Sequence, residues 1–138
     1  MKLDRIITLT AAAALLSAGF AGTATAEPDV EIETSWSKQW QSTIDRDYLV
    51  AHGNKWQSQN FSLPGGSNQG RAVFKCTGGG DAKVSIKNLN TGQVHSKTHN
   101  CNGDRHHVDP VAYRSGEALR IFIDRSSKTT TIEAWAGR

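Results

Sequence analysis

The sequence predicts an all-β fold: a small single-domain β-sandwich or jelly roll of about seven to eight short antiparallel strands with one disulfide. Three observations predict it. Apolar and polar residues alternate over short runs, Gly and Asn turn signals separate these runs, and no stretch from residue 44 onward shows a convincing helical period. The chain also has only two cysteines, Cys76 and Cys101, which supply the predicted bridge.

The first 26 residues have the pattern of a secretory signal peptide. Lys2 and Arg5 precede an apolar run at residues 6–20, and small residues follow up to Ala26. The apolar run is shorter than the roughly 20 residues of a membrane-spanning helix, so we expect no membrane anchor. Cleavage leaves 112 of the 138 residues. We therefore expect a secreted protein, extracellular or, if the producing cell has an outer membrane, periplasmic.

The remaining chain is polar and nearly balanced in charge. It holds 20 Val, Ile, Leu and Phe residues against 32 Ser, Thr, Asn and Gln residues, which predicts one domain with a thin core. The full chain has 16 basic and 13 acidic side chains, a net charge of +3, and the two signs are interspersed. This composition excludes a multidomain enzyme, and it gives no basic stripe of the kind that binds nucleic acid.

Residues 27–43 form a polar segment ahead of the predicted domain at 44–138. Val30 and Ile32 alternate with acidic residues, and Trp36 and Trp40 follow. Two interpretations stay open: a first edge strand, or an extended arm that becomes ordered on a partner.

From residue 44 the pattern is β. A short apolar run at 48–51 ends at His-Gly-Asn, and a run with three large apolar residues at 55–63 ends at a Gly-rich loop. Alternation then predicts strands separated by turns that contain Gly, Asn or Ser at residues 71–77, 82–86, 93–99, 119–124 and 130–135.

The cysteines constrain how these strands are arranged. Two cysteines in an exported chain usually form one disulfide, whereas a metal site would need two further ligands and no C-x-x-C pair exists. In a three-stranded meander the strands that end at Cys76 and Cys101 would lie about 9–10 Å apart. That exceeds the roughly 7 Å limit for bridged Cα atoms. These strands should therefore pair directly or face each other across the sandwich.

The sequence gives only weak evidence for catalysis. His99 and His106, with Asp109, are the best candidates for a metal site or a small hydrolase, but a polar hairpin in water explains them more simply. No nucleophile elbow, phosphate-binding loop or specific carboxylate pair is present. We therefore predict a protein that is not an enzyme and needs no cofactor or metal.

The tryptophans are the best candidates for binding. Trp135 has the strand parity of Thr131 and Glu133, which places it on the more polar face, where its ring can stack on a sugar or pack against a partner. The alternative is that Trp135 is core. Tyr113 is a second candidate for a stacking ring. Trp36 and Trp40 either anchor the polar segment to its own domain or serve as hot-spot residues on another protein.

The layout of the chain resembles a known class of assembly. An Ala-rich leader, a polar arm over residues 27–40 and a β domain with one disulfide resemble the small secreted adaptor subunits of actinobacterial umbrella toxin particles. The resemblance implies a β module that bridges a lectin-bearing subunit and a toxin-bearing one. It covers layout rather than matched residues, so it transfers no functional positions.

Three hypotheses follow for function. The first is a non-catalytic secreted module that binds another extracellular protein, as an adaptor does, through the arm and its tryptophans. The second is a carbohydrate-binding module that uses Trp135 and Tyr113. The third is a small secreted hydrolase or metal-binding protein that uses His99, His106 and Asp109.

Overall fold

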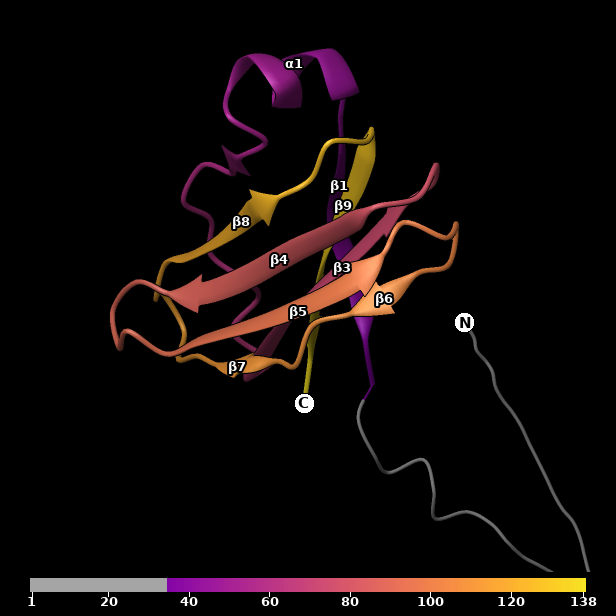
Figure 1. Cartoon of the computed structure of the whole chain (residues 1–138). Helices are drawn as coiled ribbons and strands as arrows, with labels where there is room; N and C mark the ends of the chain where they lie inside the picture. Colours follow the sequence, from indigo (N-terminus) through magenta and orange to yellow (C-terminus); the bar gives the residue numbers. More distant parts are fainter. Residues whose placement is uncertain (1–34) are drawn as a thin grey trace, which may run out of the picture. The chain divides into compact units, whose positions relative to one another are not determined.

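The structure is a computed structural model that describes residues 35–138. The predicted signal peptide and residues 27–34 lie outside this part. The described chain forms two antiparallel sheets and one short helix, which confirms the all-β class (Figure 1). Its elements are β1 (Ser37–Ile44), α1 (Arg46–Ala51), β2 (Trp56–Gln57), β3 (Gln69–Cys76), β4 (Asp81–Asn88), β5 (Val94–Asn100), β6 (His106–His107), β7 (Val111–Ala112), β8 (Leu119–Arg125) and β9 (Thr130–Gly137).

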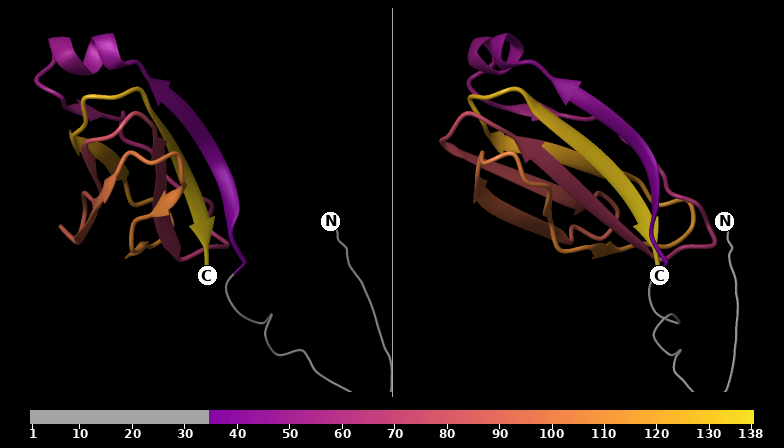
Figure 2. Two further views of the ribbon diagram at one scale, coloured as in Figure 1. Left: turned by 45° about the vertical axis from the view of Figure 1, so that its right-hand side comes forward. Right: turned by 90° about the vertical axis from the view of Figure 1, so that its right-hand side faces the viewer.

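The two sheets pack face to face as a sandwich. Sheet A has the order β1-β9-β3-β6, with β7 also paired to β3, and sheet B has the order β2-β8-β4-β5. The long strands β1 and β9 lie side by side along one flank of the molecule (Figure 2). Because β1 and β2 are the outermost strands of their sheets, the edge that they share is one place where the space between the sheets opens.

The core follows the alternation predicted from the sequence. In β4, β8 and β9 every second residue is buried and points toward the other sheet, while most of the residues between them are half-buried. The largest fully buried apolar side chains of the core cluster are Phe74, Leu49, Ile86, Leu119, Ile121, Ile123 and Ile132. Burial of these side chains supplies most of the favourable free energy of folding.

The predicted disulfide forms and crosses the sandwich. Cys76 ends β3 in sheet A, Cys101 follows β5 in sheet B, and their Cα atoms lie 4.6 Å apart. This is the second of the two arrangements expected from geometry. Backbone hydrogen bonds from Gly79 to Cys101, from Cys101 to Gly80 and from Gly103 to Cys76 join the same two segments. The Gly-rich connection at 78–80 has positive φ throughout, so it carries the chain from one sheet to the other in three residues.

The β prediction for residues 48–51 is wrong, because these residues belong to helix α1. The chain must pass here from the edge of sheet A to the edge of sheet B, and a six-residue helix makes that passage while burying only Leu49. Gly53 and Asn54, both with positive φ, end the turn. The apolar run is too short to show a helical period. Within residues 35–138 no helix is long and apolar enough to cross a membrane.

One other segment contains less strand than the pattern predicts. Only Trp56 and Gln57 of residues 55–63 form a strand, and Phe61 adds a single bridge to Leu119. The described part of the polar segment does contain a strand: β1 runs antiparallel to β9 from Ser37 to Ile44. Residues 37–43 are therefore an edge strand of sheet A.

Candidate functional site

An open groove lies at the β1–β2 edge of the sandwich, where Trp40, Trp56 and Phe61 come together. Its volume is about 330 Å³, and its remaining lining residues are Ser42, Ser58, Gln59 and Asn60. This volume is at the lower end of the roughly 300–1,000 Å³ typical of small-molecule sites. Three of its seven lining residues are aromatic.

Strand pairing fixes where the three rings point. Trp40 lies opposite the buried Ala134, and Trp56 lies opposite the buried Ile123, so both indoles are directed into the space between the sheets. The Phe61 ring meets the Trp40 ring edge to face, with centroids 5.2 Å apart. All three rings are half-buried against the core and expose one side to the groove.

Polar side chains line the rest of the groove, and one of them is held in a defined orientation. Asn60 Oδ1 accepts hydrogen bonds from Nε and Nη2 of Arg120, whose Nη1 donates to Gln57 at 3.2 Å. Because the acceptor end of this amide faces Arg120, its NH₂ end is directed away from the guanidinium. Within residues 35–138 that NH₂ group has no hydrogen-bond partner, so it is available as a donor to a ligand.

Trp56 also lines two neighbouring hollows on the side of α1. One, of about 410 Å³, includes Tyr48, His52 and Phe122 among its lining residues, and the other, of about 270 Å³, also reaches Tyr48. The Tyr48 and His52 rings are stacked with centroids 3.7 Å apart. Trp56 thus stands between the groove and a second aromatic surface.

The lining of the groove combines aromatic rings with neutral polar groups. Its lining consists of aromatic rings, hydroxyl groups and amides, and it contains no titratable side chain. General acid–base catalysis requires such a group, so the groove has no means of moving a proton with a side chain. Flat apolar surfaces beside neutral hydrogen-bonding groups suit a ligand that has both an apolar face and hydroxyl groups.

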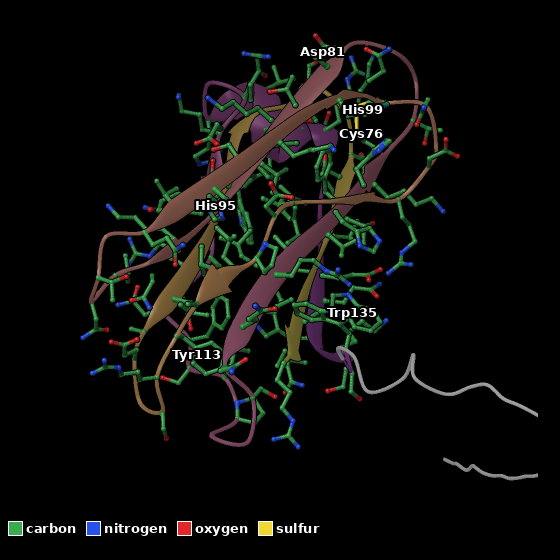
Figure 3. All side chains as sticks on the ribbon, turned by 90° about the horizontal axis from the view of Figure 1, so that it is seen from below. Cys76, Asp81, His95, His99, Tyr113 and Trp135 are labelled. Carbon is green, nitrogen blue, oxygen red and sulfur yellow. A yellow bond between two sulfur atoms is a disulfide. The ribbon has the colours of Figure 1, made fainter. Side chains whose placement is uncertain are left out.

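The other predicted binding residues lie elsewhere. Trp135 is half-buried on the outer, more polar face of sheet A, as its parity predicts, and its Nε1 donates to Glu133 at 2.8 Å. Tyr113 lies apart from it (Figure 3). The residue is only 4% exposed, and its hydroxyl donates to the Pro64 carbonyl at 2.6 Å. The hypothesis that Tyr113 offers a stacking ring is therefore wrong, since its ring is part of the core.

The two tryptophans of the polar segment have different surroundings. Trp40 packs against the core and lines the groove. Trp36 precedes β1, and the guanidinium carbon of Arg71 lies 4.1 Å from the centre of its ring. Both therefore contact their own domain, as the first of the two interpretations expects.

The histidine candidates come together without forming a metal site. The rings of His99 and His106 are stacked with centroids 3.7 Å apart, so they turn their faces toward each other rather than their nitrogens toward a common point. Asp109 does not join them. Residues 35–138 contain no group of three or more His, Cys, Asp or Glu side chains able to hold a metal ion.

Acidification is expected to destabilise the domain between about pH 7 and pH 5. Burial lowers the pKa of His106, with a further contribution from His99, and burial with the charges of Arg71 and Arg105 lowers the pKa of His107. The unfolded chain therefore takes up protons near the ordinary value of 6.5 before the folded chain does. This stabilisation is complete above pH 6.5 and is lost as the pH falls toward the folded-state values.

Thermal unfolding followed by circular dichroism at several pH values checks this. His106→Gln should flatten the pH dependence in that window. An unfolding temperature that stays constant or rises on acidification from pH 7 to 5 would contradict the expectation.

Trp56, Phe61 and the amides beside them were not predicted as site residues. The sequence places them in one run at 55–63, but only the tertiary pairing of β1 with β9 and of β2 with β8 brings Trp40 beside them. The available signal was the spacing of two large aromatic residues within a run rich in Ser, Gln and Asn.

Comparison of the chain with protein-family models, with curated proteins and with solved structures found no match.

Proposed function

We propose that this protein is a non-catalytic carbohydrate-binding module whose aromatic groove takes a neutral saccharide. The observation that carries the proposal is the convergence of Trp40, Trp56 and Phe61 in one open groove lined otherwise by hydroxyl and amide groups. Aromatic faces cover the apolar C–H face of a sugar ring, and the Asn60 amide and the Ser42 hydroxyl provide directional bonds to its hydroxyl groups.

The absence of charge in the groove supports a neutral ligand. A buried or half-buried ion would need a partner in the ligand, whereas neutral hydroxyl groups require only matched donors and acceptors. Arg120, the nearest guanidinium, is already engaged by Asn60 and Gln57. The hypothesis of a protein partner held by the arm stays a prediction, because residues 27–34 lie outside the described part of the chain.

The test is a screen of the mature protein on an array of neutral glycans, followed by calorimetry with the best ligand. Trp56→Ala is expected to weaken binding about 30-fold, since loss of a central aromatic anchor costs about 2 kcal/mol or more. Trp135→Ala is the matched control, because it removes an indole outside the groove, and it should leave the affinity within about two-fold.

A second variant tests the groove without removing a ring that packs against the core. Asn60→Ala removes the oriented amide from the surface and should weaken binding about ten-fold while the thermal transition stays near that of the wild type. If the wild type binds no neutral glycan, or if Trp56→Ala and Asn60→Ala bind as well as Trp135→Ala, the proposed function is wrong.

A further inference from the structure

The outer face of sheet A has a second pair of tryptophans, and unlike the groove this face is positively charged. Its outward side chains come from alternate positions of neighbouring strands. Lys38 of β1, Trp135 of β9 and Arg71 of β3 lie in one row across the sheet, and Gln41, Glu133, Val73 and His107 lie in the next. Arg105 precedes β6 beside the second row.

The cations on this face outnumber the acids. Lys38, Arg71 and Arg105 are cationic, and Glu133 is the single carboxylate among the outward strand residues of the two rows. Glu133 is already engaged: its Oε1 accepts from Arg105 Nη2 at 2.7 Å and from Trp135 Nε1 at 2.8 Å. Burial would raise the pKa of Glu133, but these hydrogen bonds outweigh it and lower the pKa, so Glu133 is ionised near neutral pH.

Arg71 has no acidic partner among residues 35–138. The ion pair of Arg105 with Glu133 is the one formed within residues 35–138, and Arg71 Nε is buried there without a hydrogen-bond acceptor. The guanidinium instead stacks on Trp36, 4.1 Å from the ring centre. The Nε atom is itself buried, so a ligand reaches this guanidinium through its other two nitrogens. A negative charge there offsets the cost of holding the cation half-buried.

Packing holds the side chains around Arg71 in place. Val73 points to this outer face, yet it is only 1% exposed and is not part of the core cluster. Its cross-strand neighbours are Glu133 and His107, so the side chains of the polar face pack over it. The Arg105 guanidinium also lies over Trp135, with its carbon 5.7 Å from the ring centre. Packing thus holds two guanidinium groups and two indoles in fixed places.

We propose that this face is an anion site that binds a carboxylate-bearing saccharide, a uronic acid unit, with Arg71 as the principal carboxylate ligand and the indoles of Trp36 and Trp135 beside the sugar ring. A guanidinium matches a carboxylate in shape and binds it through two parallel hydrogen bonds. The site lies on the opposite side of sheet A from the core and shares no lining residue with the groove. It does not depend on the proposed function.

The aromatic residues favour an acidic sugar over a simple anion. A small anion such as acetate satisfies Arg71 but leaves both indoles uncovered, whereas a pyranose ring that carries the carboxylate contacts an indole as well. We therefore expect glucuronate to bind more tightly than acetate, and acetate more tightly than glucose. An acidic peptide offers the same carboxylate without the ring.

The experiment is a titration of the ¹⁵N-labelled mature protein, followed by NMR, with glucuronate, acetate, glucose and triglutamate at the same ionic strength. Arg71→Gln is expected to weaken glucuronate binding at least ten-fold, because it removes a charge-assisted pair of hydrogen bonds. Arg125→Gln removes an equal charge from the end of β8 and is the matched control, expected to bind within two-fold of the wild type.

The pH dependence provides an independent readout. His107 faces Arg71, Arg105, Glu133 and His106. A bound carboxylate adds a negative charge near this histidine, so glucuronate affinity should rise as the pH falls from 7.5 to 6. On acidification the affinity for glucuronate should thus rise, whereas the stability of the domain falls.

The affinities are read from the amide signals of β3 and β9 on this face. Three results would overturn the proposal: tighter binding of triglutamate than of glucuronate, equal affinities of this face for glucuronate and glucose, or an unchanged affinity in a folded Arg71→Gln variant. Failure here is distinguishable from failure of the groove. Trp56→Ala should retain glucuronate binding, and Arg71→Gln should retain binding of neutral glycans.

Discussion

Replacing Cys76 and Cys101 together by alanine is expected to lower the free energy of unfolding by about 3 kcal/mol. The bridge closes a loop with a sequence separation of 25 residues, for which the chain-entropy model gives a stabilisation of this order. A loss of this size lowers the unfolding temperature of a small domain by roughly 15 °C. Urea unfolding of the wild type and the double variant, followed by tryptophan fluorescence, measures the difference.

The position of the bridge makes its loss harder to compensate. It joins β3 of sheet A to the end of β5 in sheet B. Among residues 35–138, the backbone hydrogen bonds between the two sheets at that corner are those of residues 76–80 with 101–103. Wild type reduced with dithiothreitol should behave like the double variant. Equal urea midpoints for oxidised wild type and double variant would show that the bridge contributes nothing to stability.

The sequence predicts best where one face of a strand is buried and the other is not. In residues 82–86 and 130–135, apolar and polar side chains alternate because only one side of each strand meets the core, and both segments are strands in the structure. The same parity places Trp135 on the outer face. The distance argument for the disulfide succeeds because it needs only the spacing of strands in a sheet and the reach of a bridge.

Prediction fails where tertiary pairing decides the outcome. Residues 46–51 form a helix because the chain must change sheets there. For residues 37–43 the sequence leaves an edge strand and an extended arm open, and pairing with β9 makes them a strand. The groove cannot be predicted from the sequence for the same reason. Trp40 and Trp56 are 16 positions apart, and each is inward-facing only by virtue of its own cross-strand partner.

A buried amide gives the other large expected effect on stability. Asn88, which ends β4, is fully buried, and its side chain makes four hydrogen bonds. Its Nδ2 donates to the Ala112 carbonyl and to Glu117, both at 3.0 Å, and its Oδ1 accepts from the backbone amides of Asn90 at 2.8 Å and Thr91 at 3.1 Å. One side chain thus joins the β4–β5 turn to the segment that leads from β7 to β8.

Asn88→Ala is expected to lower the free energy of unfolding by about 3 kcal/mol, since it leaves buried groups without partners as well as removing the bonds. Urea unfolding measures the loss.

Asn88→Asp tests the two ends of the Asn88 side chain separately. It keeps the acceptor for the turn amides but places a carboxylate beside Glu117. In the wild type the pKa of Glu117 is lowered, first of all by its hydrogen bond from Asn88. Relative to wild type, the Asp variant should therefore recover stability as the pH falls toward about 4, where carboxylates become protonated. The Ala variant should show no such recovery, and equal losses in both variants at every pH would mean that the bonds to the turn amides contribute nothing.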